Sequence, residues 1–427
     1  MFRVYILLVF LLFAGELASA QNTRSLDYYL QAAGSYSPEL KENLNLQKTN
    51  LLQADLNKSQ LRKPQVFVSA DYLFAPFFFN NGQFISITPN PTSEAIGYDP
   101  GLSNGGLYSG LLNISYPIFN GSIYKATTLQ IENQNKILKN TNSRALHDLE
   151  NNVKTQYVII YQLQQQILYS KKIIDLVTDR KKIVHLLVEQ GIMQQSDYLL
   201  LDIEISSRQF DIVQLKTTLS DAFTTLNNLC GISDTTLFEL GQPELKLTGL
   251  LPRFNYEQKY ALDSLDIALQ QLVANTKYKP QVMVFGNTGL NAIDAENIPH
   301  NLGLSAGIHL SIPIYDGHQK KINNEQFKLT QLSLGNYKSD QIIQQKNKLN
   351  ALLQQIQNVT LSISFIDKQL EQQNELLLLI KDKVASGQVS VTDYLDAIKD
   401  FALANQNKIQ SQTQLWQLIN QYNYINW

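Results

Sequence analysis

Hydrophobic side chains recur every seven residues along residues 121–190, a stretch that contains no proline. Two such seams, offset by three residues, are the positions that pack in a coiled coil. They are Leu146, Val153, Ile160, Ile167 and Ile174 in one row and Leu149, Gln156, Leu163, Ser170, Val177 and Val184 in the other. At about 1.5 Å per residue, one helix over this stretch would be roughly 100 Å long. A bilayer's hydrocarbon layer is about 30 Å thick, so we expect the helix to project through water.

The pattern is used twice. After a turn at Gly191 a second heptad helix runs to Cys230-Gly231, and a further seam extends from Ile342 to Val384. At a constant offset along the chain, Gly191 corresponds to Gly387 and Asp197 to Asp393. Internal repetition predicts one structural unit in two copies. We place repeat one at about 36–230, a linker rich in Gly and Pro at about 231–253, and repeat two at about 254–427.

Each repeat also contains residues that alternate with a period of two, which predicts strands. Hydrophobic residues occupy every second position within 66–74, 108–116 and 302–312, and Ser, Asn, Asp and Gly are frequent between them. We therefore expect one strand hairpin per repeat, at about 64–118 and 280–313. The segment 75–105, rich in Pro, Asn and Gly, reads as a long loop. Before the first hairpin, Ser37-Pro38-Glu39 predicts the start of a helix over 36–62.

Similar motifs join strand to helix in both repeats: Y-P-I-F-N-G at 116–121 and I-P-I-Y-D-G at 312–317. Pro117 and Pro313 lack an N–H and are expected to end strand pairing. Gly121 and Gly317 are expected to adopt a left-handed conformation that redirects the chain.

The N-terminus and the composition narrow the class of protein. Arg3, the apolar run from Val4 to Phe13 and Ala18-Ser19-Ala20 predict a signal peptide over 1–20, with the mature chain starting at Gln21. Cys230 is the one cysteine, so no intramolecular disulfide is expected. A net charge of −2 with 17% charged residues gives no electrostatic footprint for nucleic acid.

No later run is apolar enough for a membrane helix, which leaves a periplasmic protein, a secreted protein or an outer-membrane β-barrel. Four strands per chain cannot stand in lipid alone, because open sheet edges are not tolerated there. The smallest single-chain barrels have about eight strands. The fold expected is mainly α with a β-barrel portion, in which several copies pool their strands into a barrel and their helices into a tube.

Together these motifs resemble the TolC-like outer-membrane efflux proteins, over nearly all of residues 36–425. The resemblance rests on the two strand-to-helix turns, on the G-x5-D-Y-L turns that begin at Gly191 and Gly387, and on the tandem layout. It implies a homotrimer with twelve strands in one outer-membrane barrel and a helical tunnel across the periplasm of a Gram-negative cell. It also implies docking onto a periplasmic adaptor protein and an inner-membrane transporter.

Asp393 and Asp396 are three residues apart at the start of a predicted helix, where carboxylates also act as caps. The resemblance makes both of them, together with Asp197, candidates for the pore constriction. It makes Gly191 and Gly387 candidates for the adaptor-contact tips. The Tyr and Arg that lock the closed mouth in the family are replaced by Val384 and Val389, so closure by apolar contact is expected here.

The sequence offers little support for an enzyme or a scaffold. The five histidines are scattered and no nucleophile elbow, zinc or phosphate motif occurs, so we expect no enzyme, metal site or cofactor. A non-conducting coiled-coil scaffold would not need alternating strands. Within transport, small-molecule efflux and a type I protein-secretion duct both remain open. Soft-metal export is disfavoured because only Met193 and Met283 follow the signal peptide.

Overall fold

A computed structural model describes residues 23–88, 90–98, 108–249, 256–293, 296–386 and 388–427. The predicted signal peptide and Gly387 lie outside this part of the chain. The chain forms two compact units. One contains the segments up to Leu44, Asn140–Gln258 and Tyr337–Trp427, and the other contains Asn45–Lys139 and Lys259–Asn336. Each unit takes segments from both halves of the sequence.

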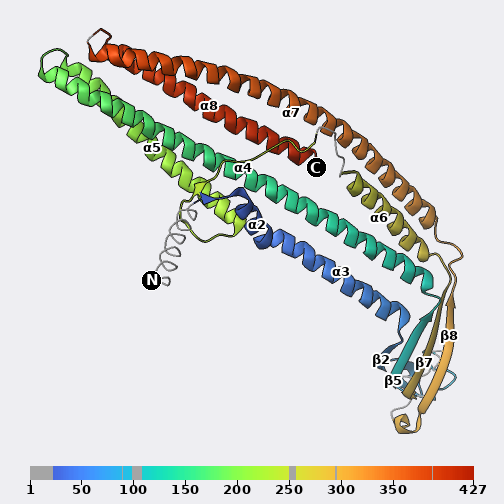
Figure 1. Ribbon diagram of the computed structural model, residues 1–427. Helices are drawn as coiled ribbons and strands as arrows, with labels where there is room; N and C mark the ends of the chain where they lie inside the picture. Colours follow the sequence, from blue (N-terminus) through green and yellow to red (C-terminus); the bar gives the residue numbers. More distant parts are fainter. Residues whose placement is uncertain (1–22, 89, 99–107, 250–255, 294–295, 387) are drawn as a thin grey trace, which may run out of the picture. The chain divides into compact units, whose positions relative to one another are not determined.

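Long helices dominate the chain and are paired through tight turns. Helix α4 (Gly121–Glu189) is followed by α5 (Gln195–Cys230), and α7 (Gln319–Ala385) is followed by α8 (Val391–Ile425) (Figure 1). Gly231 ends α5 in a left-handed conformation with φ of 65°, as its position after the last seam residue predicts.

The predicted seams are confirmed where α4 packs on α5. The shared core contains Val153, Ile160, Leu163, Ile167, Ile212, Leu219, Ala222 and Leu226. Leu146 is the exception, because its side chain is 36% exposed. Since each buried aliphatic side chain stabilises by about 1.5–3 kcal/mol, the seam holds this helix pair together.

The N-terminal part of the described chain adds elements that the sequence pattern did not predict. Strand β1 (Thr23–Arg24) pairs in parallel with β6 (Glu239–Leu240), and helix α2 (Leu26–Tyr36) follows. The Tyr157 hydroxyl on α4 lies 3.1 Å from the Arg24 carbonyl oxygen and 2.9 Å from that of Gly241. This hydroxyl therefore ties both short strands to α4.

Two shorter helices precede the strand hairpins. Helix α3 (Pro38–Arg62) begins where predicted, and the Leu40 N–H donates to Ser37 Oγ at 3.4 Å. Helix α6 (Tyr256–Thr276) is its counterpart in the second half. Among the residues the structure covers, no helix combines the length and apolar character that crossing a membrane requires.

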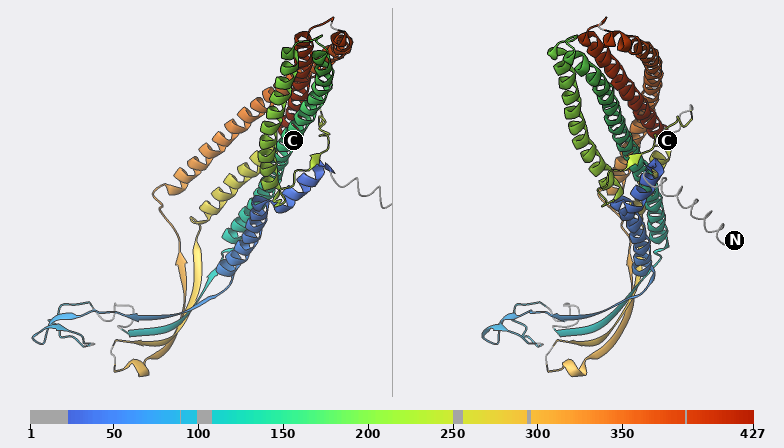
Figure 2. Two further views of the ribbon diagram at one scale, coloured as in Figure 1. Left: turned by 90° about the vertical axis from the view of Figure 1, so that its left-hand side faces the viewer. Right: turned by 60° about the vertical axis from the view of Figure 1, so that its left-hand side comes forward.

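A four-stranded antiparallel sheet lies in the second unit, in the order β2-β5-β7-β8 (Figure 2). Its strands are β2 (Gln65–Tyr72), β5 (Tyr108–Ile118), β7 (Gln281–Ala292) and β8 (Leu302–Ser311). A short 3-10 turn, η2 (Ile298–His300), precedes β8. The register pairs even-numbered residues with even-numbered residues in every strand, as in Val66 with Ile114 and Gly286 with Ala306. One face of the sheet is therefore even-numbered throughout.

The prediction of an irregular loop over 75–105 is wrong in part. Strands β3 (Phe77–Asn80) and β4 (Gln83–Ser86) form a hairpin there. Asn81 and Gly82 join them with φ of 48° and 80°. Positive φ at both central residues is typical of a type I′ turn, for which Asn-Gly is the favoured pair.

Two predictions about the strand-to-helix turns are also wrong. Pro117 does not end pairing, because it lies opposite Met283 and β5 continues to Ile118. On its other side β5 pairs with β2 only as far as Ser115, and a proline is compatible with such an open edge. Gly121 is the first residue of α4, and Phe119 adopts the left-handed conformation instead, with φ of 63°.

The second turn agrees with the sequence. Gly317 is left-handed with φ of 61°, and Pro313 follows the end of β8 at Ser311. His318 is left-handed too, with φ of 66°.

Candidate functional site

The first candidate tip is the turn between α4 and α5. Gly191 has φ of 71°, and its N–H donates to the Val188 carbonyl at 3.0 Å. The Ile192 N–H donates to the Leu187 carbonyl at 2.8 Å. A Cβ at Gly191 would meet no atom within 4 Å. Glycine is therefore favoured there by backbone conformation and not by lack of space.

The second candidate tip joins α7 to α8. The Gln388 N–H donates to the Lys383 carbonyl at 2.8 Å, and Ser390 caps α8. Gly387 itself is outside the described residues.

Two of the three candidate pore carboxylates contact the N-cap residue of their helix, Asp197 through its backbone and Asp393 through its side chain. The Asp197 carboxylate accepts from the Gln194 N–H at 3.1 Å. The Asp393 carboxylate accepts from Ser390 Oγ at 2.7 Å, and Ser390 Oγ accepts from the Asp393 N–H at 3.1 Å. Capping therefore accounts for part of why each carboxylate stands in the first turn of its helix.

Asp396 follows one turn later and is exposed, like Asp393. Asp400 lies one turn further along α8 and is exposed as well. Residues at i, i+3 and i+7 share one helix face, so the three carboxylates form a stripe. The sequence analysis missed Asp400, although this spacing is visible in the sequence.

Beneath the tips, one apolar cluster joins all four long helices. It contains Ile173, Val177 and Val184 of α4, Leu201 and Ile205 of α5, Val384 of α7, and Val391, Tyr394, Leu395, Ile398 and Ala402 of α8. Val384 is fully buried there and Val389 packs against the cluster. These two valines therefore contribute to packing within one chain, whether or not they also meet another copy.

Arg180 of α4 is buried in the same region with 2% exposure. Its guanidinium carbon lies 5.0 Å from the centre of the Tyr394 ring. Its Nε and Nη1 atoms have no hydrogen-bond partner among the described residues. No local sequence pattern indicates this contact, because the two residues are far apart in the chain.

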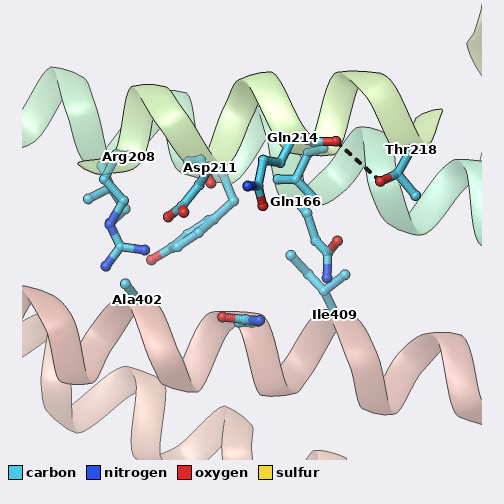
Figure 3. A pocket seen from close by; sticks show the side chains of 12 residues that line it. Gln166, Arg208, Asp211, Gln214, Thr218, Ala402 and Ile409 are labelled. Atoms are coloured by element: carbon cyan, nitrogen blue, oxygen red, sulfur yellow. Dashed lines mark hydrogen bonds between the residues drawn. The ribbon is translucent and has the colours of Figure 1, made fainter. Parts of the chain in front are cut away.

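A cavity of about 330 Å³ lies between α4, α5 and α8 (Figure 3). Gln166, Arg208, Asp211, Gln214 and Ile409 line it together with Tyr169. Burial raises the pKa of Tyr169, whose hydroxyl has no partner in the part of the chain described. Arg208 donates through Nε to Glu204 at 2.8 Å, and Thr218 donates to the Gln214 carbonyl at 3.2 Å. The hydrogen bonds of Arg208 and Thr218 therefore lie within α5 itself.

The sheet has two chemically different faces. The even-numbered face of β8 carries Leu304, Ile308 and Leu310, and Leu304 is 84% exposed. The odd-numbered face carries hydrogen bonds between polar side chains of neighbouring strands. Asn113 Nδ2 donates to Ser69 Oγ at 2.9 Å, and Ser305 Oγ donates to Asn287 Oδ1 at 2.7 Å.

Tyrosines mark the ends of the even-numbered face. Tyr72 and Tyr108 lie side by side at one end with ring centres 5.2 Å apart, and Tyr116 lies on the same face near the other end of β5. Tyr108 and Tyr116 are about 26 Å apart along the strand at about 3.3 Å per residue. Among the described residues, no group of three His, Cys, Asp or Glu side chains is arranged to hold a metal ion.

Several solved structures with a similar fold are of outer-membrane proteins. VceC of Vibrio cholerae has a TM-score of 0.69 and 12% identity, over 94% of this chain and 96% of that one. The CmeC channel of Campylobacter jejuni has a TM-score of 0.69 and 15% identity, over 95% and 86%. The MtrE channel of Neisseria gonorrhoeae has a TM-score of 0.69 and 14% identity, over 94% and 88%. Neither a family model nor a curated protein matches the sequence. The chain therefore has the fold of the TolC-like outer-membrane efflux channels that its sequence resembles.

Proposed function

We propose that this chain is one protomer of a trimeric outer-membrane channel, the exit duct of a tripartite efflux or secretion system. The observation that carries the proposal is the two-faced sheet. Its apolar face is exposed and flanked by tyrosines, and its opposite face carries Ser and Asn side chains that hydrogen-bond to one another. Membrane barrels need an apolar band about 25 Å tall with aromatic girdles, and a polar interior.

The edges of the sheet support association with other copies. Strands β2 and β8 are the outer strands of the order β2-β5-β7-β8. An open edge in lipid leaves backbone N–H and C=O groups unpaired, and each such group costs several kcal/mol. Three copies would supply twelve strands and close the sheet.

The helices offer a matching surface for assembly. On α5, the exposed side chains Leu199, Ile203, Phe210 and Val213 are spaced by four, seven and three residues. This spacing gives a second heptad stripe, distinct from the buried one. We assign it to packing between copies, which would build the periplasmic tunnel.

The acidic stripe of α8 supplies the proposed constriction. Asp393 and Asp396 in three copies would place six carboxylates at the periplasmic mouth, with Asp197 beside them. A ring of carboxylates favours cations and is open to block by divalent cations. The tips at Gly191 and Gly387 are the proposed contacts for a periplasmic adaptor protein, which would connect the duct to an inner-membrane transporter.

The remaining assignments follow from the same proposal. Residues 1–20 would be removed as a signal peptide, repeat one (about 36–230) and repeat two (about 254–427) would each give one hairpin to the barrel, and residues 231–253 would link them. The barrel would be surrounded by outer-membrane lipid.

Single-channel recording tests the proposal. Protein extracted by detergent from the outer-membrane fraction is added to a planar bilayer, and divalent cations are added from each side in turn. We expect a small, steady, cation-selective conductance that divalent cations block from the side of the helical tips. A protein found only in the soluble periplasmic fraction, with no conductance, would instead be a coiled-coil scaffold.

A further inference from the structure

The hairpin β3–β4 displays an aromatic surface that the channel proposal leaves without a role. Phe78, Phe79, Phe84 and Ile85 make up this surface, which we name the tip patch. Phe84 packs edge-on against Phe78 and Phe79, with ring centres 6.1 and 5.4 Å away. The rings remain exposed all the same, Phe79 at 59% and Phe84 at 65%.

The hairpin is held in place by contacts within its own chain, and these contacts leave the side chains of the tip patch exposed. Phe77 is buried, and a Cβ at Gly97 would come within 2.4 Å of its ring. Phe78 and Ile96 exchange backbone hydrogen bonds of 2.8 and 3.0 Å, and Thr92 N–H donates to Asn80 Oδ1 at 2.9 Å. These contacts fix one side of the hairpin and leave the tip patch uncovered.

Phe79 has a left-handed backbone with φ of 59°. This conformation is unfavourable for a bulky residue and persists only where the surrounding structure imposes it. Here it accompanies an exposed ring that contacts the ring of Phe84.

Charge and position indicate which environment covers the tip patch. Between Leu73 and Tyr98 the sequence has one charged residue, Glu94. A surface of phenylalanine without charge fits the boundary between lipid headgroups and acyl chains, where aromatic side chains concentrate. Phe78 is six residues beyond Tyr72, which ends the apolar face of β2, so it is within about 20 Å of it. The tip patch therefore lies near one end of the proposed lipid-facing surface.

We propose that the tip patch inserts into the adjoining lipid leaflet, at the end of the sheet where Tyr72 and Tyr108 lie. The inference rests on the proposed membrane barrel. The second repeat carries no counterpart, since residues 293–301 contain no aromatic residue other than His300. Each chain would make this contact once.

Tryptophan quenching by brominated lipid tests the inference on the full-length protein. Trp416 and Trp427 are replaced by Phe, and Phe79→Trp, Phe84→Trp or Leu304→Trp is introduced singly. Each variant is reconstituted in phosphatidylcholine vesicles with and without brominated acyl chains, and iodide is the aqueous quencher. Leu304, on the exposed even-numbered face of β8, is the matched control because it reports on the barrel and not on the hairpin.

We expect brominated lipid to quench Phe79→Trp and Phe84→Trp to an extent comparable with Leu304→Trp, with little quenching by iodide. Quenching of Leu304→Trp alone, with the hairpin positions quenched by iodide or by neither agent, would overturn the lipid contact and leave the channel intact. Protection of the hairpin positions from both brominated lipid and iodide would indicate that another copy covers the tip patch. Absence of lipid quenching at all three positions would overturn the proposed barrel itself.

Discussion

The guanidinium carbon of Arg180 lies 5.0 Å from the centre of the Tyr394 ring, and this contact joins α4 to α8 inside the apolar cluster beneath the tips. A cation over an aromatic ring stabilises by about 0.5–2 kcal/mol. Each buried donor without an acceptor costs about 1–3 kcal/mol, and Arg180 has two such nitrogens. The balance is therefore unfavourable for a lone arginine at this position.

We predict that Arg180→Met stabilises the protein by on the order of 1 kcal/mol, because an apolar side chain of similar volume removes the unpaired donors. The measurement is thermal unfolding of the detergent-purified protein, followed by the loss of helical circular dichroism. Tyr394→Phe is the control, since it keeps the ring. A lower unfolding midpoint for Arg180→Met would mean that a carboxylate from another copy pairs with the guanidinium in the assembly.

Substitutions at Asp393 and Asp396 of α8 can distinguish the effect of their negative charge from their effect on the helix N-terminus. Asp393→Asn keeps an oxygen that can accept from Ser390 Oγ, whereas Asp393→Ala leaves Ser390 as the cap but loses this side-chain hydrogen bond and should destabilise by about 1 kcal/mol. Asp396 makes no capping contact that would confound its substitution. We expect Asp393→Asn with Asp396→Asn to lower cation selectivity and weaken divalent block while the unfolding midpoint stays unchanged. Unaltered selectivity in planar bilayers would remove both residues from the pore.

The α4–α5 tip can be altered with little backbone strain if the residue at Gly191 tolerates positive φ. Gly191→Asn retains a residue that tolerates positive φ, so we expect folding and export to be kept. Ile192→Glu places a charge on the exposed neighbouring residue, and we expect it to reduce cross-linking to the periplasmic adaptor and to lower export. Cross-linking yields equal to those of the unmodified protein would reject this tip as a docking surface.

Cys230 should be unreactive in the folded protein. It is buried, its Sγ lies 3.4 Å from the Tyr29 carbonyl oxygen, and burial raises the pKa of its thiol to about 11 from 9.0. The thiolate is the reactive form, so at pH 8 its concentration is about 100-fold lower than at the ordinary pKa. We expect iodoacetamide to modify the folded protein at least that much more slowly than the chain unfolded in guanidinium chloride. Similar rates would indicate that the packing of α2 against α5 opens readily.

Much of the fold could be predicted because it depends on periodicity. The seam from Val153 to Ile167 packs as its spacing indicates, and β5 and β8 follow the alternation of hydrophobic residues. Hydrophobic burial is collective, so one misplaced residue such as Leu146 does not change the outcome.

Turn geometry was harder to predict because single side chains determine it. In the second turn the Asp316 carboxylate accepts from the His318 and Lys320 N–H groups at 2.9 and 3.0 Å, and the left-handed residues follow it. Asn120 is the corresponding residue in the first turn, where the chain turns at Phe119 instead. The two motifs are similar in sequence, so this difference could not be predicted from them.

The hairpin within 75–105 could have been found. Asn81-Gly82 stands between two runs of hydrophobic residues, which is the strongest short-range signal for a hairpin. The Pro and Gly residues around this pair favoured the prediction of a loop. By contrast, no local pattern could reveal the Arg180–Tyr394 contact or the pairing of β1 with β6, because both depend on how distant segments meet.

The even-numbered register of the sheet sets a rule for how this chain can change in length. A single residue gained or lost inside β2, β5, β7 or β8 would turn the rest of that strand over and carry Ser and Asn to the apolar side. The described residues between β2 and β5 pair in the separate β3–β4 hairpin and not in the four-stranded sheet, so that segment is free of this constraint. Insertions and deletions of any size should therefore accumulate there outside β3 and β4, whereas the strands of the sheet should gain or lose residues only in pairs.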